Sequence, residues 1–322
     1  MSRSRHWLVG IVGTLLAGCT TFRTPIPLTD AAPGHTTFHA IPVGDKSRTF
    51  LLHLPPAAAT RRVPLVLVFH GHTANADVAM RTSEMNRMAD SLGIAVLYPD
   101  GSGRVRGIGL SWNVGSCCGY AQAHQVNDIA FVDSLHAAMI RTRRIDMNAV
   151  FAAGFSAGGM MAPKVACERA TIVRAVADVA GAMPDAVCTP AAPVAVLLIH
   201  GDDDDELRYD HSRGATTGAP AYARSYDSAA VFWERINRCA GTGSANTTQM
   251  PGSGVRSRVA SACGSGRPVQ VVSIPAHPHA WPGGRSSWWF APKPSKVLDG
   301  SAFVLTFFAE QLRRDSASTS RR

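Results

Sequence analysis

Short runs of apolar residues recur along the chain and predict the strands of a buried sheet. Most of them end at a turn containing Gly, such as His-Gly or Pro-Asp-Gly. Runs that are apolar throughout are typical of parallel strands covered on both faces, whereas a half-exposed strand alternates apolar and polar residues. The expected strands are 64–69, 94–98, 149–155, 175–180, 193–199 and 269–274, preceded by an alternating strand at 48–54.

Segments with apolar residues at helical spacing lie between these strands. One begins with Ser and Glu and ends at Gly93, and another carries Arg residues near its carboxyl end, where positive charge stabilises the helix dipole. The expected helices are 83–92, 128–142, 160–168, 228–237 and 302–312. Strands that alternate with helices indicate βαβ units. The pattern therefore predicts an α/β fold: a single domain with a doubly wound, mostly parallel sheet.

The N-terminal residues predict an export signal rather than part of this domain. Arg3 and Arg5 precede an apolar run at 7–17, which is too short to span a bilayer. The run leads into Leu-Ala-Gly-Cys at 16–19, which resembles the bacterial lipobox, whose Cys is acylated and becomes the mature N-terminus. We expect lipidation at Cys19, which would tether the protein to a membrane. Secretion without a lipid anchor is the alternative.

Length, composition and charge are those of a globular protein and give little support to a nucleic-acid-binding protein. The 322 residues are 46% apolar, which is enough for one large buried core. The formal net charge is +9, and the two arginines of the signal contribute to it. The remaining positive charge is scattered and mostly Arg, without a basic helix or a patch of alternating basic and aromatic residues. Nucleic-acid binding therefore has little support.

The cysteines predict disulfides. Apart from Cys19 there are six, an even number that in an exported protein indicates paired rather than free thiols. No Cys-x-x-Cys pair occurs, so we expect no metal site. Cys239 and Cys263 flank a stretch rich in Gly, Ser and Thr, and we predict that they pair with each other.

A nucleophile is predicted at Ser156. Residues 154–158 read Gly-Phe-Ser-Ala-Gly and satisfy the G-x-S-x-G pattern, between a predicted strand and a predicted helix. The flanking glycines allow the sharp turn that exposes the Ser hydroxyl. The backbone amide of Ala157, directly after the nucleophile, and that of His72, in the loop after strand 64–69, are the expected donors of an oxyanion hole.

A Ser hydroxyl needs a base, and the base needs an acid that orients it. In this fold the acid and the base follow later strands, in that order. Strand 193–199 is followed by four consecutive Asp residues, 202–205, and the pattern alone leaves the acid open among them. Strand 269–274 is followed by His277 and His279. We favour His279 as the base because His277 lies nearer the strand and is followed by Pro278.

Seven segments, in order, resemble the polyhydroxybutyrate depolymerase and feruloyl/acetylxylan esterase group of the α/β-hydrolase superfamily. They are Val68-Phe69-His70-Gly71-His72, Tyr98-Pro99-Asp100-Gly101, Ser111-Trp112-Asn113 with Cys117-Cys118-Gly119, 127–132, 154–161, His200-Gly201-x-x-Asp204 and His279-x-Trp281-Pro282-Gly283-Gly284. The resemblance extends from Arg48 to Phe308, almost the whole mature chain.

The resemblance implies specific catalytic residues. It makes Asp204 the acid, with Tyr209 five residues later, and His279 the base; Asp205 remains a fallback acid. The chain departs from the group at Asn127, where relatives often have an acidic residue, and at Ala157, where they often have Asn. Neither departure removes a catalytic side chain.

Aromatic residues near these motifs are candidates for substrate binding. We expect Trp112 and Trp281 to contact the substrate, because aromatic faces suit aryl or apolar acyl groups. Trp288, Trp289 and Phe290 follow soon after, and packing under a long loop is at least as good an interpretation for the two tryptophans.

The resulting hypothesis is an exported, lipid-anchored serine esterase that hydrolyses carboxylic esters through an acyl-enzyme, with no cofactor and no obligate protein partner. Candidate substrates are polyhydroxyalkanoate, feruloyl or acetyl esters, some of them polymeric. Acyl transfer to carbohydrate or lipid hydroxyls of the cell envelope is an alternative, as is a non-catalytic surface-binding protein. The expected organisation is a signal peptide at 1–18, a tether at 19–40, the esterase domain at 41–315 and a flexible tail at 316–322.

Overall fold

A computed structural model describes residues 23–115, 117–184, 188–207, 223–224, 226–240 and 246–319. The predicted signal peptide, Cys19, Tyr209 and the last three residues of the predicted tail lie outside these described residues.

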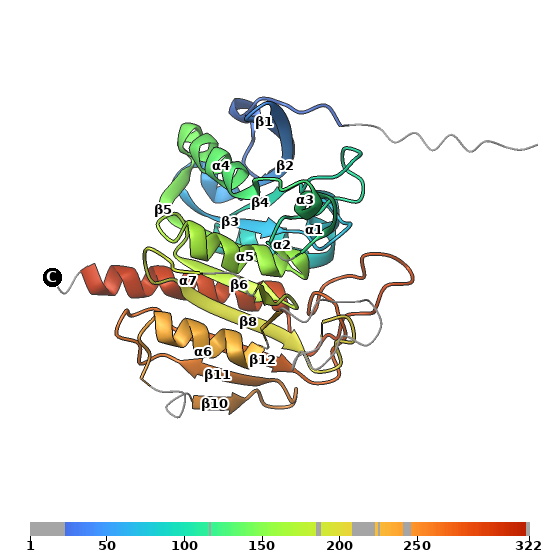
Figure 1. Ribbon diagram of the computed structural model, residues 1–322. Coiled ribbons are helices and arrows are strands. Elements are labelled where there is room, and N and C mark those ends of the chain that lie inside the picture. The colour runs from blue at the N-terminus through green and yellow to red at the C-terminus, as the bar shows by residue number, and fades with distance from the viewer. Residues whose placement is uncertain are drawn as a thin grey trace, which may run out of the picture.

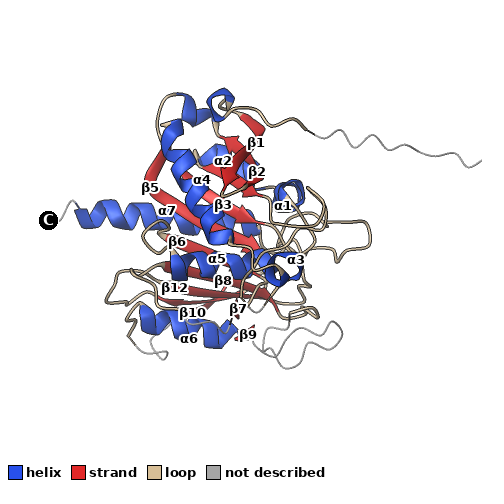
Figure 2. Ribbon diagram, turned by 45° about the horizontal axis from the view of Figure 1, so that its top comes forward, coloured by secondary structure: helices blue, strands red, loops and turns tan. Residues whose placement is uncertain are grey.

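A mixed sheet of ten strands forms the centre of the molecule (Figures 1 and 2). Its six middle strands, in the order β4-β3-β5-β6-β8-β12, pair in parallel, and antiparallel strands extend it at both edges. The strands, from one edge to the other, are β1 (His35–Val43), β2 (Lys46–Leu54), β4 (Ala95–Pro99), β3 (Val63–Phe69), β5 (Ile145–Phe155), β6 (Ala175–Val179), β8 (Ala195–Gly201), β12 (Val269–Ile274), β11 (Arg256–Ala260) and β10 (Asn246–Gln249). A separate pair joins β7 (Met183–Pro184) to β9 (Ala223–Arg224).

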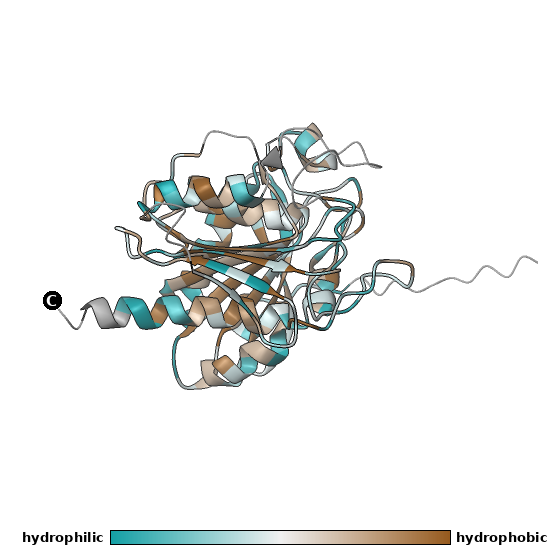
Figure 3. Cartoon of the chain, turned by 90° about the horizontal axis from the view of Figure 1, so that it is seen from below, coloured by the Kyte–Doolittle hydropathy of each residue, from teal (hydrophilic) through white to brown (hydrophobic). Residues whose placement is uncertain are grey.

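Helices cover both faces of the sheet (Figure 3). On one face α4, α5 and α6 pack on strand residues such as Leu67 and Val196, and on the other α1, α2 and α7 pack on Val66 and Val179. The helices are α1 (Ala76–Ser83), α2 (Met85–Leu92), α3 (Gly119–Ala123), α4 (Asp128–Thr142), α5 (Ala157–Glu168), α6 (Tyr226–Ile236) and α7 (Gly300–Thr319), with short 3-10 helices at Leu28–Asp30 and Pro56–Ala59. Strands buried on both faces have no solvent side, so they are apolar throughout.

The expected fold class is confirmed: the structure is one α/β domain with a largely parallel sheet. All seven strands expected from the sequence are present, and α4 has the expected bounds. Strand β1 begins at His35, so the folded part starts inside the segment 19–40 that we expected to be a tether. The helix expected from residue 83 begins at Met85, because Glu84 adopts a left-handed conformation (φ 52°) that ends α1 and precedes α2.

The six cysteines of the domain form three disulfides. Cys239 pairs with Cys263, as predicted from the loop between them. The other two pairs are Cys167–Cys188 and the adjacent residues Cys117–Cys118. Among the helices of the described residues, none is both long enough and apolar enough to cross a membrane.

Candidate active site

Five loops that carry the sequence motifs meet at one end of the sheet, where the parallel strands have their carboxyl ends. The loops follow β3, β4, β5, β8 and β12, and parallel strands have their carboxyl ends on the same side of a sheet. Ser156 directly follows β5, Asp204 lies three residues after β8, and His279 lies five residues after β12. The topology therefore brings together three side chains that are far apart in the sequence.

Ser156 lies at the tip of a sharp turn between β5 and α5. Its backbone has φ 55° and ψ −122°, a conformation that L-residues rarely adopt. The turn is held by hydrogen bonds from Ser156 N to Val179 O (3.0 Å) and from Met160 N to Ser156 O (3.0 Å). Both flanking positions require Gly: a Cβ at Gly154 would lie 2.0 Å from Gly158 O, and a Cβ at Gly158 would lie 2.1 Å from Phe69 O.

His279 is paired with Asp204. Its Nδ1 lies 2.7 Å from Asp204 Oδ2, and since the carboxylate accepts, Nδ1 carries the proton. The other ring nitrogen, Nε2, is then the basic one. The imidazole also packs against Phe155, next to Ser156, with ring centroids 4.8 Å apart.

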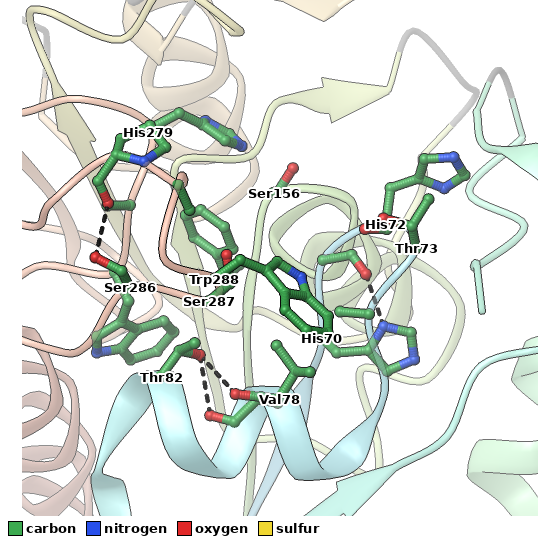
Figure 4. Close-up of a pocket in the computed structure, with 18 of the residues that line it drawn as sticks. His70, His72, Thr73, Val78, Thr82, Ser156, His279, Ser286, Ser287 and Trp288 are labelled. Carbon is green, nitrogen blue, oxygen red and sulfur yellow. Dashed lines mark hydrogen bonds between the residues drawn. The ribbon is translucent and has the colours of Figure 1, made fainter. Parts of the chain in front are cut away.

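Ser156 and His279 line the same cavity, which has a volume of about 470 Å³ (Figure 4). The lining comes from the end of β3 and the loop after it, from α1, from the turn at Ser156, from Glu206 in the loop after β8 and from residues 279–292. A hydroxyl and an imidazole that line one cavity can act together on a bound molecule.

Asp204 differs from its acidic neighbours. It is the only buried member of the run 202–205, at 4% exposure. Its Oδ1 accepts hydrogen bonds from the amides of Glu206 (3.0 Å) and Leu207 (2.8 Å). Burial alone would raise the pKa of this carboxyl, but hydrogen bonds from His200 and His279 outweigh burial and hold the pKa well below its usual range. Asp204 is therefore ionised, as an orienting acid requires.

The remaining aspartates have other surroundings. Asp202 is exposed and accepts a hydrogen bond from the Ala276 amide (2.6 Å), which ties the loop after β8 to the loop after β12. Asp203 and Asp205 are exposed. The geometry thus favours Asp204 over the fallback Asp205.

His277, the alternative base, has both ring nitrogens engaged. Nε2 donates to Ala280 O (2.9 Å), and Nδ1 accepts from the Ser295 amide (3.2 Å). Burial lowers the pKa of this imidazole. A histidine with no available nitrogen cannot take a proton from Ser156, so His277 supports the loop instead.

Of the two expected oxyanion donors, His72 lines the cavity, and Ala157 directly follows the cavity residue Ser156. Ala157 is the first residue of α5, where backbone N–H groups point out of the helix. Among the described residues, neither amide donates to a protein acceptor. Two amides without a protein acceptor, one of them next to Ser156, are chemically able to stabilise an oxyanion.

His70 holds the loop that carries His72. It is fully buried, and its Nδ1 donates to Gly71 O (2.7 Å) while its Nε2 accepts from the Gly101 amide (2.9 Å). Burial lowers its pKa to about 4, so it is neutral and its tautomer is set by these two bonds. His70 therefore connects the loop after β3 to the loop after β4.

Two buried carboxylates support the same loops. Asp128, at the start of α4, pairs with Arg48 (2.9 Å) and accepts from the Asn113 amide (2.8 Å). Asp100 accepts from the Thr49 hydroxyl (2.7 Å) and from the Ala76 amide at the start of α1 (2.8 Å). These bonds connect β2, which carries Arg48 and Thr49, to the loop after β4 and to the starts of α1 and α4.

One departure from the resembled group has a structural reason. Asn127 is the N-cap of α4, and its side chain accepts a hydrogen bond from the Ala130 amide (2.9 Å). Asn caps a helix as well as Asp does, so Asn at this position has little effect on the stability of α4.

The two tryptophans expected to contact substrate lie in different places. Trp281 lines the cavity, and its indole N–H donates to Ser301 Oγ (3.0 Å). Trp112 is fully buried in the core, donates to His70 O (2.9 Å) and is not part of the cavity wall. The structure thus does not place Trp112 in contact with a substrate.

Three further residues line the cavity. Trp288 and Phe290, which the sequence left as candidates for substrate contact, line it from the segment that precedes α7, although packing was an equal interpretation for Trp288. Glu206 also lines it, and its Oε2 lies 3.8 Å from His279 Nε2. The only sequence signal for Glu206 is its place two residues after Asp204. No group of three or more potential metal ligands occurs in the part of the chain that the structure describes.

The sequence matches known esterases. Residues 48–203 match the family model described as "Esterase PHB depolymerase". The putative esterase NocK of Nocardia uniformis subsp. tsuyamanensis is 30% identical over 276 residues, which cover 81% of this chain and 78% of that protein. Feruloyl esterase B of Piromyces equi is 27% identical over 71% of this chain, but the match spans only 42% of the Piromyces protein.

Solved structures share the fold. The chain is similar to an S-formylglutathione hydrolase from Agrobacterium tumefaciens (TM-score 0.56, 15% identity, 86% of this chain and 95% of that one). It is also similar to an acetyl xylan esterase from Aspergillus awamori (TM-score 0.55, 15% identity, 76% and 94%). At these identities the likeness concerns the fold.

Proposed function

Since the chain belongs to the family of PHB-depolymerase-type esterases and is an ester hydrolase, we propose that it works as a serine esterase, through an acyl-enzyme on Ser156. The observation that carries the proposal is the hydrogen bond from His279 to Asp204, which leaves Nε2 of His279 basic in the cavity that also contains Ser156.

In the acylation step, Ser156 Oγ attacks the ester carbonyl carbon while His279 Nε2 takes the hydroxyl proton. The carbonyl oxygen becomes an oxyanion, which the amides of His72 and Ala157 stabilise. The intermediate then collapses, the C–O bond to the alcohol breaks, and His279 returns the proton to the departing alkoxide. Ionised Asp204 stabilises the imidazolium and keeps its Nδ1–H oriented.

In the deacylation step, a water molecule takes the place of the alcohol. His279 accepts one of its protons as the oxygen attacks the acyl carbon, and the same two amides hold the second oxyanion. The bond to Ser156 Oγ then breaks, His279 gives the proton back to the Ser, and the carboxylic acid leaves. The protein needs no cofactor for either step.

The cavity fits a substrate with an apolar or aromatic acyl group. About 470 Å³ accommodates a small ester, and Trp281, Trp288 and Phe290 supply aromatic faces beside the nucleophile. Relatives named for feruloyl and acetylxylan esters are consistent with this wall. We therefore place the substrate among feruloyl, acetyl and polyhydroxyalkanoate esters, including the ends of polymers.

The protein is proposed to work outside the cytoplasm. Three disulfides are typical of an oxidising compartment. The apolar run before Cys19 and the Leu-Ala-Gly-Cys pattern support export followed by acylation of that Cys.

The test compares His279→Ala with His277→Ala on p-nitrophenyl acetate, butyrate and octanoate and on methyl ferulate. We expect His279→Ala to lower kcat by about 10³-fold or more, and His277→Ala to retain hydrolysis wherever the protein folds. Thermal unfolding reports the folding of both variants. Activity that survives in the first variant and disappears from a folded His277→Ala would overturn the assignment of the base.

A further inference from the structure

The segment 285–292, here called the aromatic loop, exposes three large apolar side chains beside the cavity. Trp288 is 59% exposed, Trp289 92% and Phe290 71%. Trp288 and Phe290 also line the cavity, whereas Trp289 does not. The expected packing of these tryptophans under a loop is therefore not what the structure shows. An aromatic cluster this exposed marks a surface that contacts something else.

A second exposed apolar segment lies on the loop after β4. Val105 is 53% exposed and Ile108 64%, and the exposed Arg104 and Arg106 flank Val105. This segment, residues 104–108, is here called the arginine loop. Alternating Arg and aliphatic side chains combine positive charge with apolar surface.

Helix α1 joins the two loops. At its start, the side chain of the N-cap Asn75 donates to Gly107 O of the arginine loop (2.8 Å). At its end, Arg81 donates to Ser287 O (3.3 Å) and Thr82 O accepts from the Arg285 amide (2.9 Å), both of the aromatic loop. Eight helical residues span about 12 Å. Both loops therefore flank the stretch of α1 that lines the cavity, and in Figure 1 they project on the side away from the C-terminus.

The chain also enters the fold at α1. The guanidinium of Arg23, the first described residue, lies 2.8 Å from Asp77 Oδ1, on the first turn of that helix. Cys19 precedes Arg23 by four residues, which reach at most about 14 Å when fully extended. An acyl chain on Cys19 would therefore hold this face of the protein close to the membrane.

We propose that the aromatic loop and the arginine loop together dock on the surface of a lipid bilayer, with the mouth of the cavity toward the headgroups. Trp is the side chain that prefers the interface, where its ring is apolar and its N–H is hydrated. Arg104 and Arg106 pair with anionic headgroups. The orientation rests on the lipid anchor of the proposed function. The apolar and charged surfaces do not depend on it.

A lipid surface fits the two loops better than a solid polyester does. Both offer apolar area to Trp289 and Ile108, but only the bilayer offers anionic groups to the arginines. The short connection to Cys19 also brings a membrane, and not a distant polymer, against this face. Esters that partition into the bilayer would then reach Ser156 from the headgroup layer.

The test measures flotation of residues 20–322 with vesicles of phosphatidylethanolamine and phosphatidylglycerol. This chain contains every described residue, including the whole sheet and both helical layers, and lacks the acylated Cys. The docking variant combines Trp289→Ser with Ile108→Ser, neither of which lines the cavity. The control variant combines Ile140→Ser on α4 with Val231→Ser on α6, which are 51% and 48% exposed on helices that cover the opposite face of the sheet from α1.

We expect the unsubstituted chain to float with the vesicles, the docking variant to lose about 10-fold or more in partitioning, and the control variant to change by less than about twofold. Partitioning of the unsubstituted chain is also expected to weaken as salt rises. All three forms are expected to hydrolyse p-nitrophenyl acetate in solution equally, which reports their folding.

The proposal is overturned if the unsubstituted chain does not float with the vesicles, or if the docking and control variants lose binding equally. It is also overturned if the unsubstituted chain binds polyhydroxybutyrate granules but no vesicles. A failure of the proposed function gives a different result. All three forms would then fail to hydrolyse p-nitrophenyl acetate, whether or not they bind vesicles.

Discussion

His200 Nε2 lies 3.2 Å from Asp204 Oδ2, the same oxygen that binds the imidazole of His279. The same nitrogen lies 2.5 Å from Leu207 O. Since both neighbours are acceptors, Nε2 carries the proton and is shared between them. Asp204 is thus held between two imidazoles, only one of which lines the cavity.

This arrangement predicts that His200 positions the acid. His200→Ala removes a hydrogen bond that favours the ionised carboxylate and is expected to lower kcat about 10-fold or more, with KM nearly unchanged. His200→Gln, which places an amide N–H near the position of Nε2, is expected to restore part of kcat. The measurement is the separation of kcat from KM on p-nitrophenyl butyrate. An equal loss in both variants would mean that His200 serves only packing.

A second prediction concerns the acid itself. Asp204→Asn presents an amide to His279 Nδ1 and disturbs the tautomer that leaves Nε2 basic. We expect kcat to fall by about 10³–10⁴-fold while the fold persists. The exposed Asp205→Asn is the matched control and is expected to stay within about twofold. The measurement is the steady-state kcat of both variants. A large loss of kcat in Asp205→Asn together with a small loss in Asp204→Asn would make Asp205 the acid.

A third prediction separates two tryptophans. Trp288→Ala removes part of the cavity wall and is expected to raise KM for methyl ferulate several-fold, with less effect on p-nitrophenyl acetate. Trp112→Phe leaves His70 O without its buried donor, so the free energy of unfolding is expected to fall by about 1–3 kcal/mol with KM unchanged. A rise in KM for methyl ferulate in Trp112→Phe alone would contradict the observed cavity.

A fourth prediction concerns pH and stability. Asp178 is fully buried; its Oδ1 accepts from the Gly181 amide (2.9 Å) and from the Tyr226 hydroxyl (3.1 Å). Burial raises its pKa from 3.8 to about 7. Between these values the folded state binds the proton more tightly than the unfolded state does, so this group's contribution to stability falls as pH rises from about 4 to 7.

Asp178→Asn keeps an acceptor oxygen but cannot titrate. Its unfolding temperature relative to the unsubstituted protein is therefore expected to rise between pH 5 and pH 8, as measured by thermal unfolding at both. The exposed Asp45→Asn controls for the loss of one carboxylate. A difference between Asp178→Asn and the unsubstituted protein that stays constant over this range would show that Asp178 is ionised throughout.

The sequence was sufficient for the central strands and for the Ser156 turn, because both depend on local patterns. Strands buried on both faces are apolar throughout, and Gly154 and Gly158 are required where backbones approach within contact distance. Helix α1 was missed because it is short and buries mainly Ala76 and Ala79, which produce a weak periodic pattern. The edge strands β10 and β11 are short and largely polar, so they resemble loops.

The surroundings of the site depend on contacts that sequence spacing does not contain. Four adjacent Asp residues look alike until the fold buries Asp204 alone. Trp112 and Trp288 are both aromatic residues near motifs, yet one fills the core and the other lines the cavity. That difference follows from how α1 holds the aromatic loop, which involves residues about 200 positions apart.

The most direct test of Ser156 as the nucleophile is intact-protein mass spectrometry after reaction with a fluorophosphonate, with the adduct located by peptide mapping. If Ser156 is the nucleophile, we expect one adduct per chain on Ser156 and none in Ser156→Ala, although that variant unfolds at the same temperature as the unsubstituted protein. An adduct that persists on folded Ser156→Ala, or an unsubstituted protein that hydrolyses esters without reacting at Ser156, would contradict this assignment.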